Sequence, residues 1–178
     1  MPPPTPDPNS SDASYSTIYK TAFAAVFVVA SGLLGLIKLP APVPSIALDA
    51  IPGYFTAGFI SPSIGGIVGF FGHLASAWTG GFPLGWIHLV VALEMAVACF
   101  VFGWVIFKIN KTYALFIAIA VAILINGILS PLLLGVLGLI PMSVAKGLVG
   151  LLTLASAINS SLAAGAIAVF SKRRTPNT

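Results

Sequence analysis

The sequence predicts an all-α integral membrane protein with six transmembrane helices, of which the second and third are short. Apolar residues make up 58% of the chain and charged residues only 7%, whereas a soluble domain carries about 25% charged residues. Such a surface does not stay in water, so the chain is expected in a lipid bilayer. The net charge of +4 is small and dispersed, which gives no indication of nucleic-acid binding.

The chain begins with a polar stretch, residues 1–16, which is rich in Pro, Ser and Asp and predicts a disordered cytoplasmic tail. This stretch lacks the basic start of a secretory signal, so the apolar run 17–37 is expected to remain as a first membrane helix. At about 1.5 Å per residue, that run covers a hydrocarbon core of about 30 Å. The following Pro-rich segment, 40–45, predicts an extended loop.

The apolar region 51–79 is interrupted by Ser61-Pro62-Ser63-Ile64-Gly65-Gly66. Because Pro with a following Gly pair signals a turn, two short helices are predicted here. Three further apolar runs, 84–107, 112–138 and 143–170, give the remaining helices, with a kink expected at Pro131. The prediction is therefore a six-helix membrane domain over 17–172 and a cytoplasmic C-terminal tail at 173–178.

Basic residues set the expected orientation, because Lys and Arg gather on the cytoplasmic side of a membrane. With a cytoplasmic N-terminus, six helices place these six basic residues inside: Lys20, Lys108, Lys111, Lys172, Arg173 and Arg174. Five spans, with 51–79 as one helix, also place six inside, so charge alone does not choose. The break at Pro62 favours six spans. The expected location is thus the plasma membrane, crossed several times, with both termini in the cytoplasm.

Glu94 lies near the middle of the predicted helix 84–107, where a carboxylate costs about 2.5–3.5 kcal/mol. Two roles stay open for it, a ligand contact and a structural hydrogen bond between helices. His73 and His88 lie near the predicted outer surface. Six residues separate His88 from Glu94, which leaves them about 120° apart around a helix. Without a metal-ligand motif, no metal or other cofactor is predicted.

Other polar and aromatic residues complete the candidate site. Asn126 and Asn159 fall within predicted spans, where an amide holds helices together for about 0.6 kcal/mol or binds a polar ligand. Asp49 precedes a helix, as either a cap or a ligand contact. Trp78 and Trp86 flank an outer loop, as interfacial anchors or stacking surfaces. The predicted substrate-binding set is Asp49, His73, Trp78, Trp86, His88, Glu94, Asn126 and Asn159.

Small residues predict close helix packing. Gly65, Gly69, Gly72 and Ser76 repeat along the predicted third helix, where packing within the chain is expected. The first helix carries a small-residue patch, Thr21, Ala22, Ala24 and Ala25, to which an apolar partner helix can dock; the predicted partner-contact residues are Thr21, Ala22 and Ala25. The sequence has no phosphate-binding loop and no nucleophile motif, so transport by this chain would need energy from elsewhere.

One stretch has a familiar pattern: Ile67-Val68-Gly69-Phe70-Phe71-Gly72-His73-Leu74-Ala75-Ser76-Ala77, then Gly81-Phe82-Pro83-Leu84-Gly85, His88 and Ala92-Leu93-Glu94-Met95-Ala96. It resembles the substrate-binding S components of energy-coupling factor transporters, in particular the subgroup associated with α-ribazole, a precursor of vitamin B12. The resemblance covers about residues 17–172.

The resemblance implies a capture subunit, not an enzyme. It would take up a vitamin from outside, while a membrane coupling protein and two cytoplasmic ATPase subunits drive delivery. In that family an Ala-x-x-x-Ala surface on helix one meets the coupling protein, and here Thr21 and Ala25 have this spacing. Loop 39–48 would act as a lid. The flat base of α-ribazole suits stacking by Trp, Phe or His, and its ribose suits carboxylate or amide acceptors.

Two alternatives stand beside this interpretation. One is a small intramembrane enzyme that uses His73, His88 and Glu94, with or without a metal. The other is a structural subunit that binds no ligand.

Overall fold

The computed structural model describes residues 8–37, 47–109, 111 and 113–172. Their regular elements are all helical, as predicted: α1 (Pro8–Leu34), α2 (Ile51–Phe59), α3 (Pro62–Thr79), α4 (Ile87–Ile109), α5 (Ala114–Ala122), the π-helix η1 (Ile123–Leu129), α6 (Ser130–Val136) and α7 (Met142–Lys172). Because α5, η1 and α6 are continuous, the described chain forms six helical segments.

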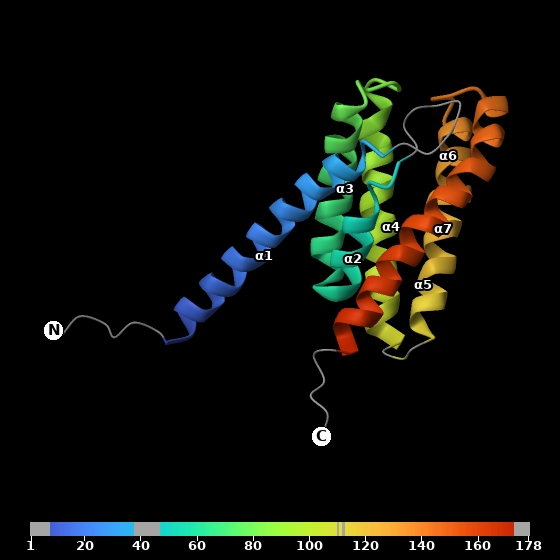
Figure 1. The fold of residues 1–178 in the computed structure, drawn as a ribbon. Helices are drawn as coiled ribbons and strands as arrows, with labels where there is room; N and C mark the ends of the chain where they lie inside the picture. Colours follow the sequence, from blue (N-terminus) through green and yellow to red (C-terminus); the bar gives the residue numbers. More distant parts are fainter. Residues whose placement is uncertain (1–7, 38–46, 110, 112, 173–178) are drawn as a thin grey trace.

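Successive segments run in alternating directions (Figure 1). The connections α3–α4 and α6–α7 lie at one end of the bundle, which we call the upper end. The connections α2–α3 and α4–α5 lie at the lower end, as do the start of α1 and the end of α7. The described helices therefore begin and finish at the same end.

Three helical segments are long and apolar enough to cross a membrane: Ile87–Ile109, Ala114–Val136 and Met142–Ser171. A shorter apolar helix covers Ile18–Leu34. The nine residues of α2 extend about 13 Å and the 18 residues of α3 about 27 Å, so the second and third helices are short, as predicted. Large apolar side chains such as Leu93, Phe116 and Val136 are exposed on the bundle, which is consistent with insertion into lipid.

The first helix begins earlier than predicted. α1 includes residues 8–16, which the sequence placed in a disordered tail. Pro8 fits this position because the first turn of a helix does not need its N–H. The N-terminal half of α1 stands away from the bundle, and its C-terminal half packs on α3 (Figure 1), where Gly32 faces Ala75. Residues 1–7 and 173–178 of the predicted tails, and 39–46 of the predicted lid, lie outside the described residues.

The small residues of α3 pack against three neighbouring helices. A Cβ atom at Gly65 would overlap Ala57 of α2. One at Gly69 would lie 2.9 Å from Cys99 Sγ of α4, and one at Gly72 would lie 2.5 Å from a side-chain oxygen of α1. The expected packing within the chain is confirmed, and it makes α3 the central helix of one side of the bundle.

The predicted kink at Pro131 takes the form of a π-helix, η1, directly before it. Proline lacks an N–H, and its ring clashes with the carbonyl four residues earlier in an α-helix. The wider turn relieves this conflict, since the Ser130 N–H donates to the Ile125 carbonyl, five residues back. Gly127 allows η1 to approach α7, because a Cβ there would lie 2.7 Å from Thr153 Cα. π-Helices often occur at functional sites.

An apolar core closes the lower half of the bundle between α2, α4 and α7. Tyr54 and Phe102 are fully buried there, with their ring centroids 5.0 Å apart. Small side chains such as Ala57, Ala98 and Ala163 surround them. The open space of the bundle therefore lies in its upper half.

Candidate functional site

A cavity in the upper half of the bundle encloses about 710 Å³ of empty space, its mouth included. Its lining comes from the segment before α2 and from α3, α4, η1, α6 and α7: Ala47, Asp49, Ala50, His73, Leu84, His88, Val91, Met95, Asn126, Ser130, Leu134, Leu148, Leu152, Ala155 and Asn159. None of these described residues is Lys or Arg.

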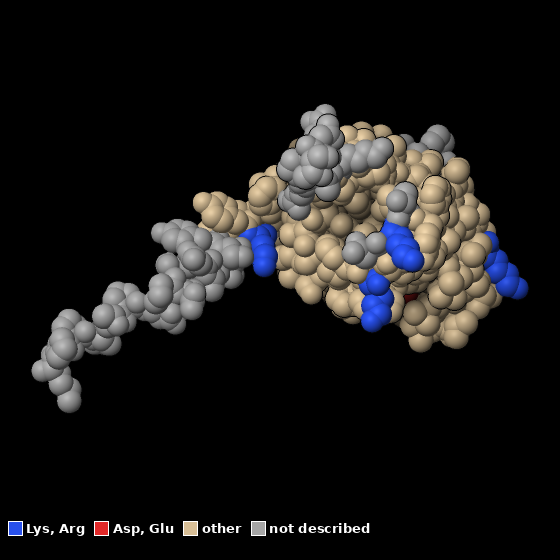
Figure 2. Space-filling model, turned by 90° about the horizontal axis from the view of Figure 1, so that it is seen from below, with Lys and Arg blue, Asp and Glu red and all other residues tan. Residues whose placement is uncertain are grey.

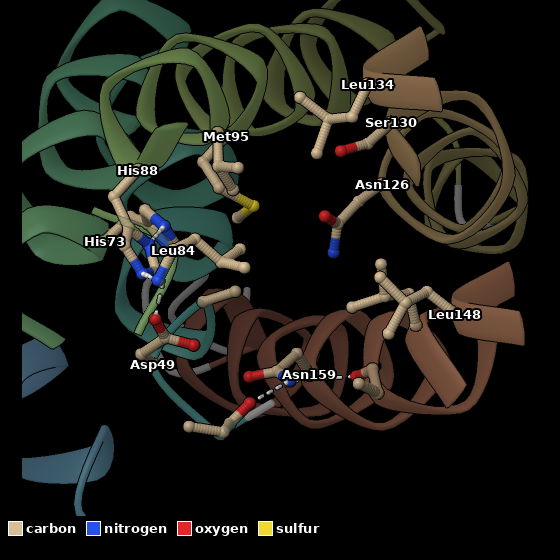
Figure 3. A pocket seen from close by; sticks show the side chains of 15 residues that line it. Asp49, His73, Leu84, His88, Met95, Asn126, Ser130, Leu134, Leu148 and Asn159 are labelled. Atoms are coloured by element: carbon tan, nitrogen blue, oxygen red, sulfur yellow. Dashed lines mark hydrogen bonds and ion pairs between the residues drawn. The ribbon is translucent and has the colours of Figure 1, made fainter. Parts of the chain in front are cut away.

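A chain of polar contacts forms one side of the cavity (Figure 3). The Oδ2 atom of Asp49 lies 3.5 Å from Nδ1 of His73, and both side chains are largely buried. Nε2 of His73 lies 3.1 Å from Nδ1 of His88. The backbone N–H of Leu84 donates to Nε2 of His88 over 3.3 Å. The chain thus joins the segment before α2 to α3, α4 and the connection between them.

The connection between α3 and α4 positions this chain through an unusual backbone. Gly81 and Gly85 have φ values of 76° and 56°, which glycine adopts without steric cost. Phe82 has φ 48°, an outlier for a bulky residue. Its ring packs against His88, with centroids 5.7 Å apart and an interplanar angle of 70°. The turn therefore holds Phe82 on the imidazole of His88 and directs the Leu84 N–H at it.

Asn159 is only 2% exposed and forms the adjoining part of the wall from α7. Its Nδ2 donates to the Ala47 carbonyl over 3.1 Å and to the Ala155 carbonyl over 2.8 Å. Its Oδ1 is buried and has no hydrogen-bond partner within the described part of the chain. In Figure 3 this oxygen is turned toward the side of the cavity on which Asp49 lies.

Glu94 reaches the cavity only through another residue. Its Oε2 accepts a hydrogen bond from Ser130 Oγ, and Ser130, unlike Glu94, lines the cavity. The bond ties α4 to the start of α6. The other carboxyl oxygen of Glu94 is buried, without a hydrogen-bond partner among the residues described. This arrangement matches the structural role that the sequence left open for Glu94.

The rest of the lining is mainly apolar. Leu134 and Leu148 project into the cavity near Asn126, which η1 carries on the side away from Asp49, and Met95 projects into it from beside His88 (Figure 3). The cavity therefore has a polar side at Asp49, His73, His88 and Asn159, and a mostly apolar side across from it. A molecule with a flat apolar part and a polar part fits such a division.

Five of the predicted site residues line this one cavity: Asp49, His73, His88, Asn126 and Asn159. The two predicted tryptophans do not line it. Trp78 is 75% exposed and Trp86 is 64% exposed, at the upper end of the bundle. Thr21, Ala22 and Ala25, predicted for a partner, lie exposed on α1, whereas Ala24 of the same small-residue patch is buried.

Sequence reasoning missed several lining residues. Ser130 offered a usable signal, since it is a hydroxyl beside a proline within an apolar run, where Pro131 disturbs the helix. Met95, Leu134 and Leu148 gave no signal, because they do not differ in type from the lipid-facing residues of the same helices.

Within the part of the chain that the structure describes, no three His, Cys, Asp or Glu side chains are grouped to hold a metal ion. Comparison of the chain with known proteins found no matching family model, no matching curated protein and no matching solved structure.

Proposed function

We propose that this chain is the substrate-capture subunit of an energy-coupling factor transporter and binds α-ribazole, or a related vitamin B12 precursor, from outside the cell. The observation that carries the proposal is the cavity. Six polar residues, spread over positions 49 to 159 of a strongly apolar chain, line one cavity. Because polar groups within membrane helices are costly, such a gathering favours a ligand site over a merely structural subunit.

The proposed arrangement in the membrane has six spans, with the upper end outside and both termini in the cytoplasm. The alternating helix directions and the three long apolar segments support it. Figure 2 views the molecule from the lower end, and lysine side chains are visible around it. Lys108 and Lys111 lie at the α4–α5 connection, on the expected cytoplasmic side. Trp78 and Trp86 then serve as anchors at the outer interface.

The cavity supports a vitamin-like ligand by its two-sided lining. A bicyclic base would lie against Met95, Leu134 and Leu148, and ribose hydroxyls would meet the polar side at Asp49 and Asn159. The site would open toward the outside, since it lies in the upper half of the bundle and its lower side is closed by the core around Tyr54.

The proposed partners are a membrane coupling protein and two cytoplasmic ATPase subunits. The surface of α1 supports a docking role, because Thr21, Ala22 and Ala25 are exposed on it. Small residues at this spacing allow a second helix to approach closely.

Uptake of radiolabelled α-ribazole tests the proposal. Cells that express the chain with the coupling protein and the two ATPases should accumulate the label. Cells with ATPases inactivated in their phosphate-binding loops are the matched control and should not. Accumulation by proteoliposomes that contain the purified chain alone, driven by a proton or sodium gradient, would overturn the proposal.

Binding is measured separately by thermal unfolding of the purified chain with α-ribazole, cobalamin, thiamine and riboflavin. A ligand at a hundred times its Kd adds about 2.7 kcal/mol of stability. The proposal expects α-ribazole to stabilise the protein most, and a chain that responds to none of the four contradicts it.

A further inference from the structure

We infer that Asp49 and Asn159 form an acceptor surface that recognises the ligand through its hydrogen-bond donors, and that His73 and His88 orient Asp49 instead of contacting the ligand by their ring nitrogens. The inference rests on the proposed function in one respect, that the ligand occupies this cavity. It goes further by specifying what the ligand must present there.

The Leu84 N–H determines which atom donates and which accepts in each contact between His88, His73 and Asp49. The Leu84 N–H is a donor in every protonation state, so Nε2 of His88 must accept from it. A neutral His88 then carries its proton on Nδ1 and donates it to Nε2 of His73. His73 in turn carries its proton on Nδ1, which faces the Asp49 carboxylate 3.5 Å away. Each step fixes the next, and the chain ends on Oδ2 of Asp49.

The consequence is a division of roles. Both ring nitrogens of His73 and both of His88 already have partners in this series of polar contacts. The two histidines therefore act as positioning residues. Asp49 is contacted through Oδ2 among the described residues, which leaves Oδ1 as its acceptor toward a ligand. An ionised carboxylate accepts hydrogen bonds and donates none.

The Asn159 amide is oriented just as firmly. Its two recorded partners, Ala47 and Ala155, both contribute carbonyl oxygens. A flipped amide would place its oxygen against two other oxygens, so the NH₂ group must face them. Oδ1 is therefore the atom left over, buried, without a partner and on the side of Asp49 (Figure 3). A buried acceptor without a partner destabilises the protein, and a ligand donor would remove this cost.

These atoms define a chemical class of ligand. It is neutral or cationic and presents two hydroxyl or N–H donors toward Asp49 and Asn159. An anionic group is disfavoured, because the Asp49 carboxylate lies on the polar side and the described lining holds no Lys or Arg. A phosphorylated form of the same molecule is then excluded.

Three matched pairs test this selectivity on the unmodified full-length protein: α-ribazole, riboflavin and thiamine, each with its monophosphate. Affinity is measured by titration of the purified chain in detergent. In every pair that binds, the form without phosphate should bind at least about 100-fold more tightly. An equal or tighter phosphate form overturns the inference, and so does the absence of binding by all six compounds.

A second experiment removes hydrogen-bond donors from the ligand. α-Ribazole with its 2′- and 3′-hydroxyls methylated keeps its acceptors but loses the two donors at these positions, and its affinity should fall at least about 100-fold. Unchanged affinity would overturn the inference. Failure of the proposed function would give a different result from failure of this inference. If only the proposed function fails, α-ribazole still binds with this selectivity, but uptake proceeds without the ATPases.

Single substitutions distinguish residues that contact the ligand from residues that position Asp49. Asn159→Leu should lower α-ribazole affinity at least 10-fold, and Ser160→Ala, a buried neighbour that does not line the cavity, is the matched control with unchanged affinity. His73→Asn retains a donor near the position of Nδ1 and should stay within about 5-fold of the natural protein. His73→Leu should lose more than 10-fold. Equal loss in both His73 variants, or none in either, contradicts a positioning role.

Discussion

Nδ1 of His88 lies 3.1 Å from Nε2 of His73, which joins α4 to α3 by a hydrogen bond between two imidazoles. The bond is not isolated, because the Leu84 N–H holds His88 from one side and Asp49 faces His73 on the other. A backbone turn, two helices and the segment before α2 are thereby linked at the upper end of the bundle.

Replacement of His88 should destabilise this end of the protein. His88→Leu keeps the apolar contact with Phe82 but removes the hydrogen-bond partners of the Leu84 N–H and of His73 Nε2. Each buried polar group left without a partner costs about 1–3 kcal/mol. The melting temperature of the purified protein should therefore fall. Leu89→Ala changes an exposed side chain of the same helix and is the control, expected to shift melting far less.

The bond between Glu94 and Ser130 should show energetic coupling. Ser130→Ala leaves the carboxylate without its recorded donor and should cost about 1–3 kcal/mol. Glu94→Gln should be nearly neutral, because its amide oxygen still accepts from Ser130 and no charge remains to bury.

Thermal unfolding of Ser130→Ala, Glu94→Leu and the double variant measures the coupling. Residues in direct contact couple by about 0.5–3 kcal/mol, so the two single effects should not add. Strict additivity would show that the bond does not contribute to stability.

Substitution of glycine by alanine should affect thermal stability differently in α3 and in α7. Gly65→Ala places a Cβ onto Ala57, where the backbones of α3 and α2 meet, and overpacking of this kind costs about 1–3 kcal/mol. Gly147→Ala adds a Cβ where no atom lies within 4 Å, and in a helix Ala is favoured over Gly by about 0.5–1 kcal/mol. Melting should fall for the first variant and hold or rise for the second. The reverse order would refute the packing of α3 on α2.

Removal of metal should have no effect. The chain of contacts occupies the ring nitrogens of both histidines, and Glu94 bonds to Ser130 instead of joining them. Incubation with a chelator should leave the melting temperature and α-ribazole affinity unchanged. Stoichiometric zinc in the purified protein, lost together with an activity on chelation, would instead support the intramembrane enzyme considered from the sequence.

The helices were predictable because their signals are local. Apolar runs give the long segments, and the break between α2 and α3 falls at residues 60–61, whereas most of the predicted interruption, residues 62–66, belongs to α3. The start of α1 at Pro8 was not predictable from the same signals, because a polar sequence can be helical without an apolar stripe. Hydrophobicity indicates where a helix is buried in lipid, not where its backbone hydrogen bonds begin.

The candidate site was predictable in its residue types but not in its geometry. The cost of an amide or carboxylate within a membrane span identifies Asn159 and Glu94, whatever the fold. The partner of Glu94 depends on the rotation of the chain at Ser130, which the π-helix alters, and the sequence indicated only a kink. The exposure of Trp78 likewise depends on the rotation of α3, to which it belongs, and Trp86 directly follows Gly85, whose positive φ turns the chain.

The hydrogen bond between Asn159 and the Ala47 carbonyl joins positions 112 residues apart. A ribosome releases these two residues many seconds apart, at the usual synthesis rate of about 5–20 residues per second. Until the last helix enters the membrane, Ala47 lacks this donor and the cavity lacks a wall. A nascent or truncated chain that ends before α7 therefore lacks this wall, and the proposed ligand capture has to wait until α7 is in place.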